Sequence, residues 1–260
     1  TTRLRDEFLI SGLFSPGHLR SSYSLLDRMV ISGATPLEPI DLTVDQHLLG
    51  TSFMLERREL GIINLGNPGT VMADGAEFTL DHSEILYVSR GTQKISLASN
   101  SADSPARFLC LSGPAHADFP TTHVAPSAMN QVSLGSKAAC NERTLFQAIH
   151  QNGIRSANLV MGFTTVSAGS VWNTMPCHTH TRRMELYCYF DLAPEHRVFH
   201  LMGEPTETRH LVIAEGEAVL SPSWSIHSGA GTADYSFVWA MLGDNQSFDD
   251  MDGVPIGDLR

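Results

Sequence analysis

The sequence predicts an all-β protein made of two related barrels or sandwiches, with only a few short helices. Short apolar runs separated by Gly, Asp and Pro fill residues 55–88 and recur over residues 159–239. Runs of this length and punctuation are typical of strands in a sandwich or barrel. The length of 260 residues fits two domains of about 130 residues each.

The first series of predicted strands follows a turn-rich N-terminal stretch. Residues 7–50 mix apolar clusters with turn formers such as Ser15-Pro16-Gly17, which indicates short strands and at most a turn of helix. The clearest strands of this half are expected within residues 55–65 and at residues 70–73, 77–80 and 85–88. Gly, Asp and Pro lie between these runs, as is typical of the turns that connect strands.

A second series of short strands fills the other half of the chain. These strands are expected at residues 159–161, 186–190, 198–202, 210–213, 218–220 and 235–239. The acidic stretch 249–252 follows the last of them and is interpreted as a solvated tail.

Composition limits the classes of partner. The 42% apolar and 17% charged residues are typical of a soluble globular protein. The formal net charge of -11 argues against non-specific binding to nucleic acid or anionic membranes, because both require a basic surface. The four cysteines show no paired spacing, and the printed sequence contains no run of signal-peptide or membrane-span type. We therefore expect a cytoplasmic protein with no nucleic-acid or membrane partner.

His178 and His180 form the centre of the candidate site. In a strand, residues i and i+2 point to the same face about 7 Å apart, whereas on a helix they would diverge by roughly 200°. Pro176 disfavours a helix here because it supplies no N–H donor. The pair is therefore predicted to point from a strand into one cavity.

Glu185 and His227 are the two further candidate ligands. Glu185 lies an odd number of positions beyond His180, so it can share the cavity only if a turn or bulge occurs at residues 181–183. His227 ends a stretch in which Pro222 marks a turn. Three imidazoles and one carboxylate suit a divalent transition metal. A chance His-x-His pair is the alternative, and the correctly spaced Glu and downstream His disfavour it.

The combined spacing resembles the two-part motif of the cupin superfamily. It runs H-x-H-x4-E and then G-x5-P-x-W-x2-H, with Trp224 where the second motif usually has glycine. The resemblance implies double-stranded β-helix barrels of jelly-roll type. Because the two halves of the chain echo each other, the chain is expected to be a bicupin.

The internal repeat predicts which half holds metal. Residues 84–88 align with residues 217–221, and extending that alignment places Lys94 opposite His227. The first half also lacks a His-x-His pair. We therefore expect a cupin-like domain without a metal site at residues 1–135 and a cupin domain with the metal site at residues 136–260.

Longer blocks resemble one family in particular, the bacterial 5-keto-4-deoxyuronate isomerases, also called 4-deoxy-L-threo-5-hexosulose-uronate ketol-isomerases. The resembling blocks are residues 55–61, 172–180, 182–185, 207–210, 221–229 and 248–252. Thr181 departs from the family, which more often has an acidic residue there, but it is not a predicted ligand.

The family resemblance implies a homohexameric bicupin with one Zn²⁺ per chain, although other divalent transition metals suit the same donors. It implies that His178, His180, Glu185 and His227 hold the metal. It also implies an aldose-ketose isomerase that converts 5-dehydro-4-deoxy-D-glucuronate to 3-deoxy-D-glycero-2,5-hexodiulosonate during degradation of pectin or other uronate polysaccharides.

The substrate carboxylate would need local cations, because the chain as a whole is acidic. Arg182, Arg183 and Arg209 are expected to bind it, since arginine pairs with carboxylates through two parallel hydrogen bonds. Tyr187 has the same strand parity as Glu185 and is a candidate proton relay, with an ordinary packed tyrosine as the alternative. The sequence does not identify the general base.

Three rival functions use similar residues. They are the related 5-deoxyglucuronate isomerase of inositol catabolism, a cupin dioxygenase, and a non-catalytic, metal-stabilised sugar-binding or storage cupin. Arginines beside the metal motif argue against the storage protein, which needs no cations next to an open coordination position.

Overall fold

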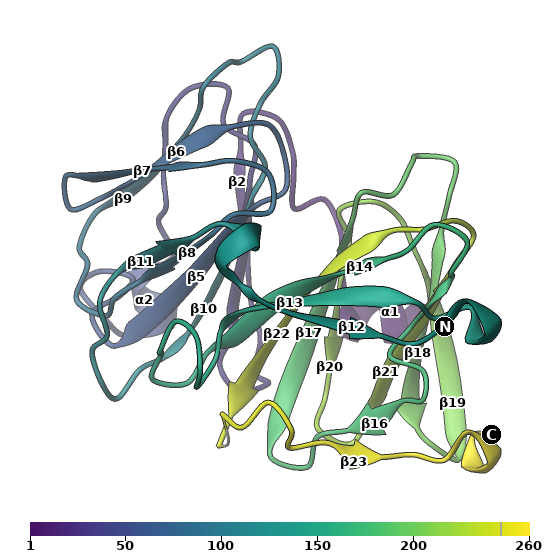
Figure 1. Cartoon of the computed structure of the whole chain (residues 1–260). Helices are drawn as coiled ribbons and strands as arrows, with labels where there is room; N and C mark the ends of the chain where they lie inside the picture. Colours follow the sequence, from purple (N-terminus) through teal and green to yellow (C-terminus); the bar gives the residue numbers. More distant parts are fainter. Residues whose placement is uncertain (245) are drawn as a thin grey trace. The chain divides into compact units, whose positions relative to one another are not determined.

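Strands dominate the computed structural model of the protein, which describes residues 1–244 and 246–260 (Figure 1). The helices and single 3-10 turns of these residues are α1 (Thr2–Phe8), α2 (Gln46–Leu49), η1 (Pro126–Ala128), η2 (Lys137–Ala139) and η3 (Ile256–Asp258). None of the described helices is long and apolar enough to cross a membrane. The predicted all-β fold with few short helices is confirmed.

The chain forms two compact units. The C-terminal unit comprises Thr1–Ser11, Asn130–Gln147 and Met161–Arg260, and the N-terminal unit comprises Gly12–Met129 and Ala148–Val160. These units differ from the contiguous halves 1–135 and 136–260 because Thr1–Ser11 belongs to the C-terminal unit and Ala148–Val160 belongs to the N-terminal unit. Division of the chain into two cupin domains near residue 135 stays a prediction.

The N-terminal unit contains two antiparallel sheets, with strand orders β11-β8-β5-β10-β3-β2 and β4-β9-β6-β7. The larger sheet consists of β2 (Leu19–Tyr23), β3 (Val30–Ala34), β5 (Arg58–Asn64), β8 (Ile85–Val88), β10 (Phe108–Pro114) and β11 (Thr122–Val124). The smaller sheet consists of β4 (Ile40–Asp41), β6 (Gly69–Ala73), β7 (Ala76–Leu80) and β9 (Ile95–Ser99). The four strands predicted most clearly for this half correspond to β5, β6, β7 and β8.

The C-terminal unit is built on a seven-stranded sheet of order β1-β20-β17-β22-β14-β13-β12. Its strands are β1 (Leu9–Ile10), β12 (Asn130–Leu134), β13 (Arg143–Ile149), β14 (Val160–Val166), β17 (Arg183–Phe190), β20 (Ala218–Ser221) and β22 (Ser236–Gly243). A four-stranded sheet of order β15-β21-β18-β19 and a small sheet of β16 and β23 complete the unit. Their strands are β15 (Trp172–Asn173), β16 (His178–Thr179), β18 (Val198–Glu204), β19 (Glu207–Ile213), β21 (Ile226–Gly231) and β23 (Asp252–Gly253).

The centre of the seven-stranded sheet is covered on both faces. Every residue of β17 is buried, and β17 pairs along its full length with β22. Aromatic side chains fill this region, with the rings of Phe146 and Phe163 stacked at 4.4 Å. Burying such side chains contributes on the order of 2 kcal/mol each, so β17 is a rigid base for the groups it carries.

The acidic stretch near the C-terminus is not the solvated tail that its charge suggested. Asp252 and Gly253 form β23, which pairs with β16 in the register His178 to Gly253. The carboxylate of Asp250 forms an ion pair with Arg182. The segment therefore has a backbone partner, β16, and a side-chain partner, Arg182, and neither can be inferred from its negative charge.

Candidate metal centre

Four side chains from three parts of the C-terminal unit converge on one point. His178 lies on β16 and His180 directly follows it, Glu185 projects from β17, and His227 projects from β21. One ligand atom from each lies within 4.8 Å of the others. Among the described residues, this is the single grouping of three or more His, Cys, Asp and Glu with such spacing.

A tight turn brings Glu185 to the histidines. Thr181 and Arg182 form the turn, and β17 begins at Arg183. The turn shifts the parity between His180 and Glu185, so that His180 Nε2 lies 2.8 Å from Glu185 Oε2. The predicted reversal at residues 181–183 is confirmed.

The ring nitrogens face each other across the cluster. His178 Nε2 lies 3.2 Å from His180 Nε2 and 3.0 Å from His227 Nε2, and His227 Nε2 lies 2.8 Å from Glu185 Oε2. His180 Nδ1 lies 2.8 Å from the backbone oxygen of Asp250. A carbonyl oxygen only accepts hydrogen bonds, so Nδ1 donates, and Nε2 is the nitrogen that faces the cluster.

Burial and neighbouring charges set the protonation states that a metal requires. Burial, together with His227, lowers the pKa of His178 to about 2, so this imidazole is neutral at physiological pH. Burial alone would raise the pKa of Glu185, but His227 and His180 outweigh it and hold the pKa well below its ordinary value. Neutral imidazoles beside a carboxylate are the forms that bind metal. The buried His/Glu group could therefore hold a divalent ion.

A segment that we call the strap, residues 247–254, lies against the candidate ligands. The buried guanidinium of Arg183 donates hydrogen bonds to the backbone oxygens of Ser247, Phe248 and Asp250. Because the same oxygen of Asp250 accepts from His180, the strap fixes the orientation of that ring. Such contacts behind a ligand commonly tune metal affinity 10- to 100-fold.

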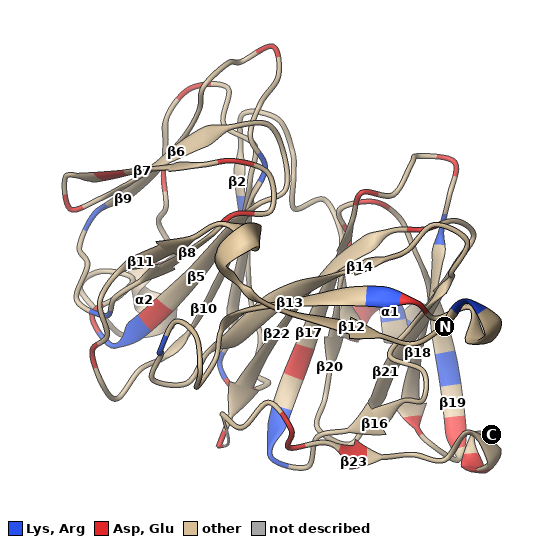
Figure 2. Ribbon diagram, in the orientation of Figure 1, with Lys and Arg blue, Asp and Glu red and all other residues tan. Residues whose placement is uncertain are grey.

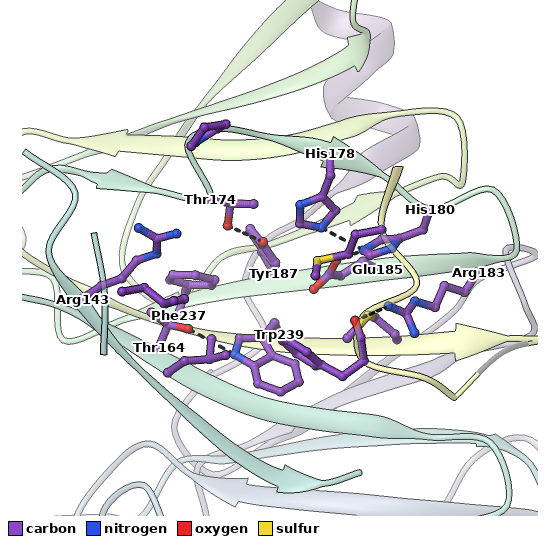
Figure 3. A pocket seen from close by; sticks show the side chains of 16 residues that line it. Arg143, Thr164, Thr174, His178, His180, Arg183, Glu185, Tyr187, Phe237 and Trp239 are labelled. Carbon is purple, nitrogen blue, oxygen red and sulfur yellow. Dashed lines mark hydrogen bonds and ion pairs between the residues drawn. The ribbon is translucent and has the colours of Figure 1, made fainter. Parts of the chain in front are cut away.

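A small cavity of about 260 Å³ opens beside the cluster (Figure 3). Alternate residues of neighbouring strands line it, as strand geometry requires. They are Arg183, Glu185 and Tyr187 on β17, and Phe237, Trp239 and Met241 on β22. Phe248 and Met251 of the strap also line it. The volume lies just below the usual range of about 300–1,000 Å³ for ligand pockets, so a small ligand is indicated.

Tyr187 points into this cavity, as its parity predicted. Its hydroxyl lies 2.8 Å from Thr174 Oγ1, and its ring centroid lies 5.3 Å from that of His227. Burial, with Glu185 nearby, raises its pKa well above the ordinary value. Tyr187 therefore keeps its proton at neutral pH. Whether it relays a proton stays a prediction.

The structure separates the three predicted arginines. Arg183 lines the cavity, but its guanidinium binds the strap. Arg182 is half exposed and ion-pairs with Asp250, and Arg209 is exposed on β19 and ion-pairs with Glu207. Neither Arg182 nor Arg209 is among the described residues that line the cavity.

Three polar lining residues escaped the sequence analysis, Arg143 on β13, Thr164 on β14 and Thr174 after β15. Thr174 lies inside the block 172–180 that resembles the isomerase family, so that block was a usable signal. Arg143 lies in none of the resembling blocks, and no local pattern distinguishes it.

The N-terminal unit has apolar side chains where this site has polar ones. In the C-terminal unit, Glu185 on β17 pairs with Ser221 on β20. On the corresponding strands β5 and β8, Leu60 pairs with Val88, and both belong to the apolar core of the N-terminal unit. The absence of a metal site from that half stays a prediction.

Comparisons with known sequences give a consistent result over the whole chain. The model of the KduI/IolB family matches residues 13–254. A protein of Kineococcus radiotolerans is 50% identical over 266 residues, covering 100% of this chain and 94% of that protein. One from Opitutus terrae is 51% identical over 259 residues, covering 99% and 93%. Both are named 4-deoxy-L-threo-5-hexosulose-uronate ketol-isomerase.

Solved structures give the fold. An IolB-like protein from Salmonella typhimurium has a TM-score of 0.70 at 14% identity, covering 95% of this chain and 96% of that chain. Oxalate decarboxylase from Bacillus subtilis has a TM-score of 0.60 at 9% identity, covering 94% and 76%. The predicted bicupin fold is confirmed, and the expected family resemblance is confirmed with it. The chain belongs to the KduI/IolB family.

Proposed function

We propose that this protein is a metal-dependent aldose-ketose isomerase that converts 5-dehydro-4-deoxy-D-glucuronate to 3-deoxy-D-glycero-2,5-hexodiulosonate in the degradation of pectin and other uronates. The observation that carries the proposal is the buried His/Glu cluster beside a small cavity. It occurs in a chain 44–51% identical, over nearly its whole length, to several proteins named as ketol-isomerases.

His178, His180, Glu185 and His227 would hold the metal, and Zn²⁺ is the ion we propose. Three nitrogen donors and one carboxylate are typical of zinc sites, although Mn²⁺, Fe²⁺, Co²⁺ and Ni²⁺ can use the same donors. When bound, the ion would polarise the substrate carbonyl and stabilise the enediolate oxygens as a Lewis acid.

Other residues that line the cavity would hold the proton that moves during isomerisation and would exclude water. Isomerisation moves a hydrogen from C2 to C1 without net oxidation, so a proton must be held near both carbons. Tyr187 keeps its proton because of burial and shares it with the hydroxyl of Thr174. Phe237 and Trp239 line the cavity with apolar surface, which limits the water that could quench the enediolate.

We also propose a cytoplasmic homohexamer, in line with the resemblance to the isomerase family. Analytical ultracentrifugation of the purified protein tests the assembly. A sedimentation coefficient of a monomer or dimer would contradict the hexamer.

The decisive experiment combines turnover with metal analysis. The wild-type protein should isomerise the deoxyuronate and contain about one divalent ion per chain. His178→Ala and His227→Ala should lose both the ion and the activity, because each removes one of four ligands. His210→Ala, a change at an exposed histidine on β19, is the control and should keep both. Turnover and metal content unchanged in His178→Ala and His227→Ala would contradict the site.

A second candidate function is isomerisation of 5-deoxyglucuronate. It is favoured by the fold match to the IolB-like protein and by the family that includes both names. Assaying the two sugars side by side distinguishes them. A higher kcat/KM for 5-deoxyglucuronate would replace the first proposal with the second.

A further inference from the structure

One of the cationic side chains that line the cavity beside the His/Glu cluster, that of Arg143, has no ion-pair partner among the described residues. Lysine and arginine are sparse and scattered over the chain, 17 against 28 Asp and Glu (Figure 2). Of the residues that line the cavity, Arg143 and Arg183 are the cations. A positive side chain half-buried in an acidic protein needs a physical explanation.

The two arginines differ in what holds them. Arg183 is 1% exposed, and its guanidinium binds three backbone oxygens of the strap. Arg143 donates from Nη1 to the backbone oxygen of Asn141 at 2.8 Å. No carboxylate within residues 1–244 and 246–260 forms a recorded ion pair with Arg143. A guanidinium has five N–H donors, so most of its capacity is available to a ligand.

The position of β13 in the sheet explains why a side chain as long as that of arginine is needed at residue 143. The order β17-β22-β14-β13 places β13 three strands from β17, about 14 Å at the usual strand spacing. A long side chain is needed to bring charge from β13 towards the cluster. In Figure 3, Arg143 lies beside Thr174, Tyr187 and Phe237, while Arg183 lies at the opposite side of the pocket.

Among the described residues, no carboxylate acts on the guanidinium of Arg143. Burial lowers the pKa of Arg143, and the groups that oppose this shift are the phenols of Tyr187 and Tyr235. The guanidinium is therefore left without an acidic partner in the cavity. A partly desolvated, uncompensated guanidinium binds a carboxylate more strongly than an exposed one does.

We propose that Arg143 binds the carboxylate of the substrate and thereby holds the carbonyl end of the open-chain sugar at the His/Glu cluster. The hydroxyl of Thr174 is the second donor at this carboxylate subsite. The inference rests on the proposed isomerase function and specifies how the enzyme selects uronates over neutral sugars. It also replaces Arg182 and Arg209, whose guanidinium groups are paired with Asp250 and Glu207.

The test separates binding from chemistry. Arg143→Gln should raise KM for the deoxyuronate about 10- to 100-fold and change kcat by a few-fold at most, because it removes a charge-assisted contact made equally before and during reaction. Arg143→Lys should recover part of the loss. Thr174→Val should raise KM a few-fold. Arg20→Gln, at an exposed position on β2, is the matched control and should match wild type.

A second readout does not depend on turnover. Calorimetry should detect tighter binding of D-galacturonate than of D-galactose to the metal-loaded wild-type protein, and Arg143→Gln should abolish the difference. Wild type that fails to isomerise the deoxyuronate but shows this preference would contradict the proposed function and support the subsite. An unchanged KM together with an unchanged preference in Arg143→Gln would overturn the subsite, as would a fall in kcat alone. Metal content measured in each variant verifies that the cluster is intact.

Discussion

His200 illustrates how a single buried group can make stability depend on pH. It is fully buried on β18, and its Nδ1 lies at hydrogen-bond distance, 2.7 Å, from the hydroxyl of Tyr189. Its Nε2 has no recorded hydrogen-bond partner among the described residues. Burial, with His227 adding to it, lowers the pKa of His200 to about 3, well under the ordinary value near 6.5.

The sign of the pH effect follows from this shift. Below about pH 6.5 the unfolded chain binds a proton at His200 and the folded protein does not, so acid favours unfolding until about pH 3. The free energy of unfolding should fall by about 1.4 kcal/mol per pH unit from this group, and the loss should be complete near its folded pKa.

His200→Gln should remove that contribution. Urea unfolding of the metal-free protein at pH 7, 6 and 5 should show a shallower loss of stability in the variant than in wild type. His210→Gln, at an exposed histidine on β19, should keep the wild-type slope. Equal slopes in His200→Gln and wild type would show that His200 is not held neutral.

Glu59 illustrates a buried charge with a purely structural explanation. Its carboxylate accepts hydrogen bonds from the hydroxyl of Tyr87 and from the backbone N–H groups of Ala157, Asn158 and Leu159. These four donors compensate for its desolvation. These contacts account for the buried carboxylate without a metal ion.

At the scale of elements, the strap and the ligand strands depend on each other. β23 pairs with β16, which carries His178, and Arg183 at the start of β17 binds the strap backbone. The metal ligands thus depend on a segment some 70 residues away in sequence. Position along the chain gives no indication of this dependence.

Arg183→Lys tests the strap. An ammonium group cannot reproduce the fork that reaches three carbonyl oxygens, so the strap should loosen and the ring of His180 should lose its fixed orientation. We expect metal affinity to fall about 10-fold and proteolysis within residues 247–254 to accelerate. Arg197→Lys is the matched control, since Arg197 also donates to backbone oxygens, those of Pro194 and His196. An unchanged metal affinity in Arg183→Lys would show that the strap does not influence metal binding.

At the scale of the whole molecule, a bound ion should couple distant segments to overall stability. The four ligands span residues 178–227, and the strap adds residues up to 254. A ligand that binds the folded chain but not the unfolded one raises the free energy of unfolding. An ion at about 1,000 times its Kd contributes about 4 kcal/mol.

Removing the metal with EDTA should therefore lower Tm by roughly 10 °C in differential scanning calorimetry. Adding back Zn²⁺ should restore it. His178→Ala should show no response to EDTA, because it cannot hold the ion in the first place. A wild-type Tm that changes neither with EDTA nor with Zn²⁺ would contradict a bound structural or catalytic metal.

The all-β class, the strands β5 to β8 and the four ligand candidates could be predicted from the sequence. These features are local, because strand periodicity, turn residues and motif spacing depend on neighbours along the chain. The part played by Arg143 could not be predicted in this way, because Arg143 reaches the cavity from a strand three positions away from β17 in the sheet. Only the tertiary structure decided that residues 252–253 form a strand, since pairing with β16 depends on long-range contacts and not on the charge of the segment itself.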